Sequence, residues 1–90
     1  MSVLRRHLEP VERPQGAPMT LDAAERDSTV RVLQISGRPR LIQRLAALGV
    51  VPGVVLIIVK SHGPAIVSIG GARVAIGQSA AQAVEVEVAP

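Results

Sequence analysis

His7 and His62 are the residues of this 90-residue chain best suited to metal binding or proton transfer. A metal site needs several histidine, cysteine or carboxylate ligands that converge, and the chain has no cysteine. No acid lies near His62 in the sequence, where the closest acids are Glu85 and Glu87 on the last predicted strand. We therefore predict a turn position for His62, and neither metal ligands nor a cofactor in one protomer. A metal site shared across an oligomer interface stays open as an alternative.

Ser61 precedes His62 and places a hydroxyl next to an imidazole in the sequence. A nucleophile and its base are recognised by geometry and by an orienting acid, and nothing in the sequence points to that acid. Gly70 and Gly71 are not a phosphate-binding loop, because no helix N-terminus with a lysine follows them. The sequence therefore predicts no catalytic residues and a protein that is not an enzyme.

The apolar residues are almost all aliphatic, since the chain contains no Phe, Tyr, Trp or Cys. A chain of this length forms one domain with a modest core, which Val, Ile, Leu and Ala must build. The β-branched residues among them favour strands. Proteins that bind single-stranded nucleic acid usually stack bases on aromatic rings. The composition therefore disfavours a nucleic-acid-binding barrel, which we keep as an alternative, and we expect no nucleic-acid partner.

Positive charge gathers in one part of the sequence. The net charge is +3, and most of the excess lies between residues 26 and 44. Arg38, Arg40 and Arg44 lie on or beside a predicted helix, and we take them as candidate partner-binding residues. They could face an acidic surface, where charges at the rim of an interface mainly raise the association rate. The alternative is that these arginines are ordinary solvent-exposed residues on the polar side of the helix.

The helix that carries these arginines is predicted over residues 41–48. Leu41, Leu45 and Leu48 recur at helical spacing and form one apolar stripe, which Ile42 widens. Pro39 suits the first helical turn, where its missing N–H is not needed. Gly49 follows the stripe at the place where a helix commonly ends in a left-handed residue.

Strands are predicted on both sides of this helix. A first strand covers residues 29–35, and residues 54–59, 65–69, 73–76 and 84–88 form four more, with a single polar turn at residues 78–82. Pro52-Gly53, residues 62–64 and Gly70-Gly71 supply tight turns. Short strands with such turns favour closure, because it removes exposed edges. We predict a mostly-β fold, a small SH3-like barrel of about five strands with one short α-helix after the first strand, plugging one end.

Residues 1–18 are predicted to be a flexible N-terminal tail, and residues 19–90 the domain. Proline and glycine interrupt every regular period in the tail. No apolar segment resembles a secretory signal or reaches the roughly 20 residues that a membrane-spanning helix needs. We expect a cytoplasmic protein that does not insert into a membrane and reaches one only through a partner.

The predicted strand at residues 54–59 is apolar on both faces, whereas successive side chains of a strand point to opposite sides. If Leu56 and Ile58 face the core, the outward side chains form a stripe of Val55, Ile57 and Val59, next to Ile66. Exposed apolar patches commonly mark interfaces. We take these four residues as the candidate surface for a partner or a homo-oligomer. The alternative is that the tail or the helix covers them.

Residues 41–53, which read LIQRLAALGVVPG, resemble the signature helix and turn of the ferrous iron transport protein A (FeoA) family. The strands that follow keep the family's order, so the resemblance extends over residues 19–88. It departs from the family in two places. The loop at residues 62–64 is shorter and lacks the family's usual aspartate, and the strand at residues 54–59 lacks the family's usual alternation of polar and apolar residues.

The resemblance implies an SH3-like barrel that assists FeoB, the membrane GTPase permease for ferrous iron. We therefore expect a non-enzymatic accessory protein of ferrous iron uptake that acts by protein–protein interaction. The family's barrel also occurs fused to metal-dependent repressors of the diphtheria-toxin-repressor type. A detached domain of such a regulator is accordingly the main alternative.

Overall fold

The computed structural model describes residues 17–89. The predicted tail, apart from Ala17 and Pro18, lies outside the described residues. The elements in chain order are β1 (Met19–Thr20), the 3-10 helix η1 (Leu21–Ala23), β2 (Thr29–Ile35), α2 (Pro39–Ala47), β3 (Val55–Lys60), β4 (Ala65–Ile69), β5 (Ala72–Ile76), α3 (Gln78–Gln82) and β6 (Val84–Val88).

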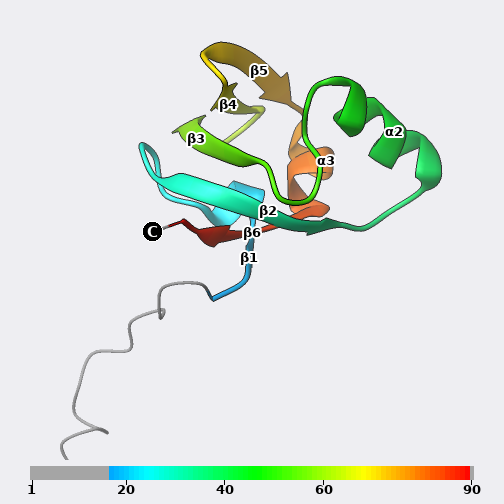
Figure 1. The fold of residues 1–90 in the computed structure, drawn as a ribbon, viewed down its shortest axis with the longest axis horizontal. Helices are drawn as coiled ribbons and strands as arrows, with labels where there is room; N and C mark the ends of the chain where they lie inside the picture. Colours follow the sequence, from blue (N-terminus) through cyan, green and yellow to red (C-terminus); the bar gives the residue numbers. More distant parts are fainter. Residues whose placement is uncertain (1–16, 90) are drawn as a thin grey trace, which may run out of the picture.

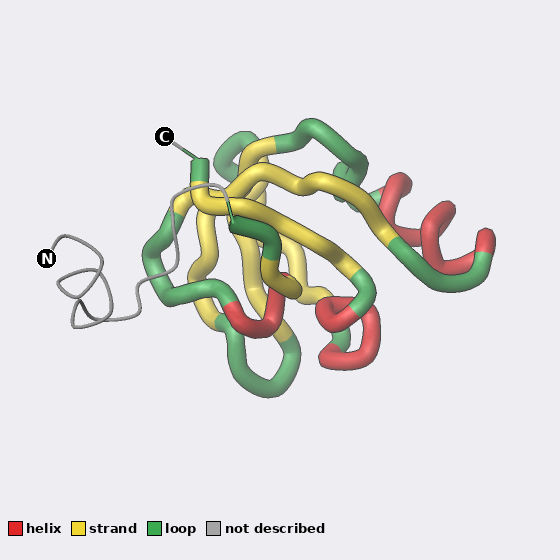
Figure 2. Tube along the Cα trace, turned by 90° about the horizontal axis from the view of Figure 1, so that it is seen from below, coloured by secondary structure: helices red, strands yellow, loops and turns green. Residues whose placement is uncertain are grey.

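All six strands join one antiparallel sheet with the order β1-β6-β2-β3-β4-β5. Figure 1 shows the sheet curled, with β1, β6 and β2 on one side and β3, β4 and β5 on the other. Figure 2, turned by 90°, shows the strands crossing over one another around a common centre. This is the predicted mostly-β, SH3-like architecture, and β1 and β5 form the two edges of the sheet.

The core lies inside the curled sheet and follows from strand alternation. In β6 the side chains of Val84 and Val86 are buried, and the glutamates between and after them are half-exposed. In β2 the buried residues are Val30 and Val32, with Arg31 between them turned outward. Because one face of each strand is apolar and the other is wet, a slip of one residue in register would expose the whole buried set.

The structure contains one strand and two short helical segments more than the sequence indicates. β1 exists through pairing with β6, where Met19 lies opposite Val86 and Thr20 opposite Glu85. A two-residue strand has no period of its own, so only its distant partner defines it. The α-helix predicted after the first strand therefore follows the second. The segment predicted as a polar turn forms α3, whose residue Ala81 is fully buried.

Helix α2 starts at Pro39, two residues before the predicted start, and projects from one end of the molecule (Figure 1). Leu45 is buried and Leu41 packs against the core. The prediction that Leu48 belongs to the same buried stripe is wrong, because its side chain is 46% exposed. The helix ends at Ala47, and Val50, which is fully buried, takes the place expected for Leu48.

Two hydrogen bonds at the end of α2 explain why Val50 is buried in place of Leu48. The N–H of Gly49 donates to the carbonyl of Ala46 at 2.9 Å, and the N–H of Val50 donates to the carbonyl of Leu45 at 2.9 Å. This is the Schellman pattern, which requires a left-handed residue, and Gly49 has φ 93°. The turn brings Val50 back over the last turn of the helix and leaves Leu48 on the outside.

Gly49→Val is expected to lower the free energy of unfolding by about 1–2 kcal/mol, because a side chain in the left-handed region costs roughly that much. A Cβ atom there would meet only Ile69, at the ordinary contact distance of 3.8 Å, so the loss reflects backbone conformation. Urea unfolding followed by circular dichroism measures it. The matched control is Gly77→Val, at φ −58° and with open space around it. Equal stability of the two variants would contradict the prediction.

The predicted reversals also form. The carbonyl of Val51 accepts a hydrogen bond from the N–H of Val54 at 3.1 Å across Pro52-Gly53. Gly70 and Gly71 both have positive φ, as a two-residue hairpin of type I′ requires, and connect β4 to β5. Within residues 17–89, no helix has the length and apolar character needed to cross a bilayer.

Candidate partner-binding surface

Strand β3 buries one face and exposes the other, as predicted. Leu56 and Ile58 lie in the core, whereas Val55 is 43% exposed and Ile57 is 46% exposed. Large aliphatic side chains that remain this accessible lose much of the 1.5–3 kcal/mol that full burial would give each of them. The described part of the chain therefore leaves these two members of the predicted stripe largely uncovered.

Val59 and Ile66, the other two members, are half-buried. Ile57 lies opposite Ser68 in β4, and Ile66 lies opposite Lys60. Ile66 is thus close to the end of β3 and not beside its centre. The structure places the four residues on one outer face of the β3–β4 pair, with the two exposed members at one end and the two half-buried members at the other.

A β-bulge in β3 separates these two ends. The register shifts between Ile58 and Lys60, so Val59 is an extra residue. Simple alternation from the buried Ile58 would turn Lys60 toward the core. The bulge resets the alternation, and Lys60 lies exposed opposite Ile66. Val59 and Lys60 thereby both reach the outer side of the sheet, and the next residue, Ser61, is buried.

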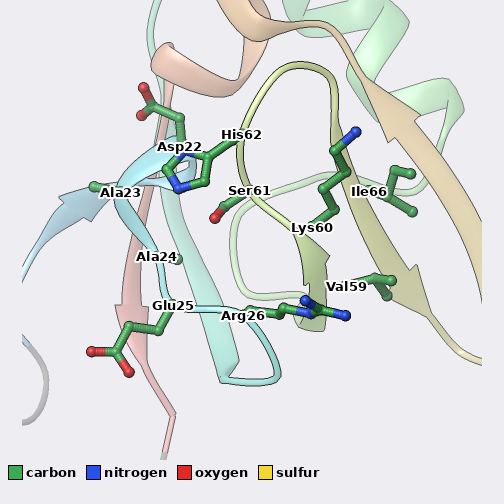
Figure 3. Close-up of a pocket in the computed structure, with 10 residues that line it drawn as sticks. All are labelled: Asp22, Ala23, Ala24, Glu25, Arg26, Val59, Lys60, Ser61, His62 and Ile66. Atoms are coloured by element: carbon green, nitrogen blue, oxygen red, sulfur yellow. The ribbon is translucent and has the colours of Figure 1, made fainter.

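An open groove of about 890 Å³ lies at this end of β3 (Figure 3). One wall comes from η1 and the residues after it, and the other from the end of β3, the following loop and β4. Its lining combines apolar, acidic and basic side chains: Asp22, Ala23, Ala24, Glu25, Arg26, Val59, Lys60, Ser61, His62 and Ile66. The sequence predicted only Val59 and Ile66 of this set as part of a binding surface.

The acids that share a groove with His62 are not the ones closest to it in the sequence. Asp22 and Glu25 line the same groove as His62, whereas Glu85 and Glu87 do not line it. The reason is that β1 pairs with β6 and carries η1 to this side of the barrel, which no local pattern indicates. Within residues 17–89, no three histidine, cysteine or acidic residues are grouped so that they could hold a metal ion. His62 occupies the loop between β3 and β4, as predicted.

The three candidate arginines are all exposed on α2. Arg38 is the N-cap residue, Arg40 lies in the first turn and Arg44 in the last. Figure 1 places α2 at one end of the molecule, and the tip of β3, with the groove, points toward the other end. The arginines and the groove are therefore separate features of the surface.

The helix N-terminus is an unfavourable place for two of these arginines. The positive end of the helix dipole favours acidic residues, and α2 has none in its first turn and no side-chain hydrogen bond at its N-cap. Arg44, in contrast, lies at the favourable end. The local energetics of α2 thus do not explain why Arg38 and Arg40 occupy their positions.

On the β2 side, the outer face of β3 is bordered by an ion pair. Arg31, which lies opposite Val55, approaches Glu87 of β6 with 3.5 Å between Nη1 and Oε2. The two side chains are 42% and 23% exposed, so the pair contributes at most about 1 kcal/mol. Gln34 extends this polar border by donating a 3.0 Å hydrogen bond to Glu85.

Comparison with known proteins places this arrangement in a family. The sequence model of the FeoA domain matches residues 19–88. A crystal structure described as iron uptake regulatory protein (FeoA) is 33% identical and superposes with a TM-score of 0.73, over 78% of this chain and 96% of that one. Among curated proteins, none matches the chain significantly.

Repressor domains share the same fold. A manganese-dependent transcriptional repressor is 27% identical with a TM-score of 0.75, over 87% of this chain and 45% of that protein. The IdeR protein of T. acidophilum is 27% identical with a TM-score of 0.75, over 90% and 36%. This chain spans less than half the length of either repressor, whereas it spans nearly all of the FeoA structure. With the family model matching most of its length, the chain belongs to the FeoA domain family.

Proposed function

We infer that this protein is a non-enzymatic accessory component of ferrous iron uptake that acts in the cytoplasm by docking on a FeoB-type membrane GTPase permease. Membership of the FeoA domain family supports the link to iron transport. The observation that carries the docking mode is the exposure of Val55 and Ile57 on the outer face of β3. A partner that covers them recovers apolar burial that the barrel itself leaves unused.

The arginines of α2 have a second role in this proposal. Arg38, Arg40 and Arg44 form an exposed cationic surface on the projecting helix, where they steer an acidic partner toward the barrel. Steering of this kind raises the association rate and weakens as salt is added.

Arg38→Asp separates helix stability from partner binding. Aspartate at the N-cap accepts a hydrogen bond from a free backbone N–H and complements the dipole, so we expect stabilisation by about 1 kcal/mol. The same change removes a cation and adds an anion, so association with an acidic partner slows. Thermal unfolding and stopped-flow association rates test the two effects. Arg38→Ala is the control that removes the charge without adding a cap, and slower association without stabilisation would show that no cap forms.

The experiment that tests the proposed function is capture of the solubilised FeoB-type permease by the purified chain. Specific capture, competed by untagged chain and reduced by salt, is the expected result. Light scattering on the free chain measures its oligomeric state in parallel. A discrete oligomer that captures no permease would assign the stripe to self-association and reject the docking proposal.

The similarity to repressor domains supports one other function, that of a detached barrel of a metal-dependent regulator. Such a domain would bind a separate DNA-binding protein. Capture of a DNA-binding repressor protein in place of the permease, dependent on added manganese or iron, would establish this alternative. Capture of the permease without such a requirement would reject it.

A further inference from the structure

The groove in Figure 3 has two dissimilar halves. One half combines basic and apolar side chains, those of Arg26, Lys60, Val59 and Ile66 (Figure 3). Asp22, Glu25 and His62 lie in the other half. The side chains of Arg26 and Glu25 point in opposite directions, so the acid does not neutralise its neighbour (Figure 3).

Backbone hydrogen bonds hold Arg26 beside β3. The N–H of Asp27 donates to the carbonyl of Ile58 at 2.7 Å, and the N–H of Ile58 donates to the carbonyl of Ser28 at 2.9 Å. Asp27 has φ 69°, a left-handed conformation that Asp tolerates better than most residues. Ser28 closes the turn by donating from its N–H and its hydroxyl to the carbonyl of Glu25. The position of Arg26 is therefore fixed by the sheet.

The bulge at Val59 positions the opposite side of this half. It turns Lys60 outward next to Ile66 and leaves Val59 half-buried between the strand ends. Bulges that redirect a side chain are frequent beside functional sites. In the described part of the chain, neither Arg26 nor Lys60 forms an ion pair or a side-chain hydrogen bond. Two cations whose backbone positions are held by the sheet, and which have no ion-pair partner among residues 17–89, thus flank a small apolar surface.

This half of the groove continues along β3 into the exposed stripe, since Val59 follows Ile57 on the outer side of the strand. The volume of the whole groove lies within the range of small-molecule pockets, but the groove is open and encloses little of a compact ligand. An extended chain could fill it and continue over Ile57 and Val55. The shape and the lining both favour a peptide segment.

We propose that the groove receives an extended segment of the partner protein, in which an aliphatic side chain lies against Val59 and Ile66 and flanking carboxylates meet Arg26 and Lys60. This deepens the proposed function and rests on it, because the segment belongs to the permease. The two cations select acidic residues, and the side chains of Val59 and Ile66 select an aliphatic residue between them.

The test uses two fluorescein-labelled peptides that differ only in charge, one with the core Glu-Ile-Glu-Ile-Glu and one with Lys-Ile-Lys-Ile-Lys. Fluorescence anisotropy with the full chain is expected to show saturable binding of the acidic peptide, weakened by salt, and none of the basic peptide. Arg26→Glu and Lys60→Glu each weaken the acidic peptide at least about tenfold. The double variant prefers the basic peptide, which a merely structural role would not produce.

Arg73→Glu is the matched control, because Arg73 is exposed on β5, outside the groove, and the change in net charge is the same. It leaves peptide binding unchanged. Circular dichroism confirms that the variants stay folded, as expected for exposed side chains.

Three results of the peptide experiment would overturn the proposal. They are equal binding of both peptides, no effect of the two groove variants, and displacement of the acidic peptide by millimolar inorganic phosphate, which would indicate a simple anion site. Dimerisation abolished by the groove variants would assign the groove to a second copy of this chain. Permease capture that survives the double variant would leave the proposed function standing and reject the groove. Selective peptide binding without permease capture would keep the groove and reject the permease.

Discussion

Ile58→Ala is expected to lower the free energy of unfolding by about 2–5 kcal/mol, the range for deleting a large aliphatic side chain from a packed core. Ile58 is fully buried and belongs to the same cluster as Leu56 and Val67. Native domains have only about 5–15 kcal/mol of stability in total, so a loss of this size removes a large part of it. The milder Ile58→Val, with an expected loss of about 0.5–1.5 kcal/mol, keeps the measurement possible.

Ile57→Ala is the matched control. Ile57 is the neighbouring residue in the same strand and the substitution is the same, so the two variants differ mainly in the burial of the isoleucine side chain. Its expected loss is about 1 kcal/mol or less, because the side chain is 46% exposed in the fold. Urea unfolding followed by far-ultraviolet circular dichroism is the suitable method, as the chain has no Trp or Tyr. Equal losses at both positions would contradict the register of β3.

The parts of the fold that the sequence predicts well are those fixed by local chemistry. Pro39 and Gly49 mark the start and end of α2 through their backbone restrictions, and Gly70-Gly71 mark a two-residue hairpin. The alternation in β6 predicts its buried face. Leu48 was misassigned because the apolar period continues one residue beyond the point where the backbone leaves the helix.

The parts that could not be predicted depend on pairing between distant segments. β1 has no identity without β6, and it is this pairing that carries Asp22 and Glu25 to the side of the barrel where His62 lies. The outward position of Lys60 follows from a bulge, which adds one residue without any sequence marker such as glycine. The sequence does contain one signal for this bulge. Lys60 directly follows the apolar run of β3 at a position that simple alternation would bury, and burying its charge would be costly.

The exposed stripe was predicted from alternation alone, but its interface role is still a prediction. The structure adds that the stripe is continuous with a groove at one end and that an ion pair, Arg31 with Glu87, borders it on the β2 side. An apolar centre with a polar border is the usual arrangement of a protein–protein interface. In the proposed complex the stripe would contribute affinity and the groove would select the partner's sequence. The arginines of α2 would raise the association rate.

Ile57→Glu is expected to weaken capture of the permease at least about 30-fold, equivalent to the 2 kcal/mol that defines a hot spot, while the barrel stays folded. In the free protein the glutamate side chain reaches water, next to Thr29 and Ser68. In the complex the carboxylate would be buried against an apolar surface without a partner, which is costly. Surface plasmon resonance with the immobilised permease measures the loss, expected mainly as faster dissociation.

Gln78→Glu is the control for charge, because it adds the same carboxylate at an exposed position in the first turn of α3, outside the stripe and the groove. It is expected to bind as the unmodified chain does. Collapse of the Ile57→Glu fold would mean that the outer face of β3 is a second buried surface, covered in solution by another part of the chain. Unchanged binding by a folded Ile57→Glu would exclude the stripe from the interface, because a docked partner could not leave that carboxylate hydrated.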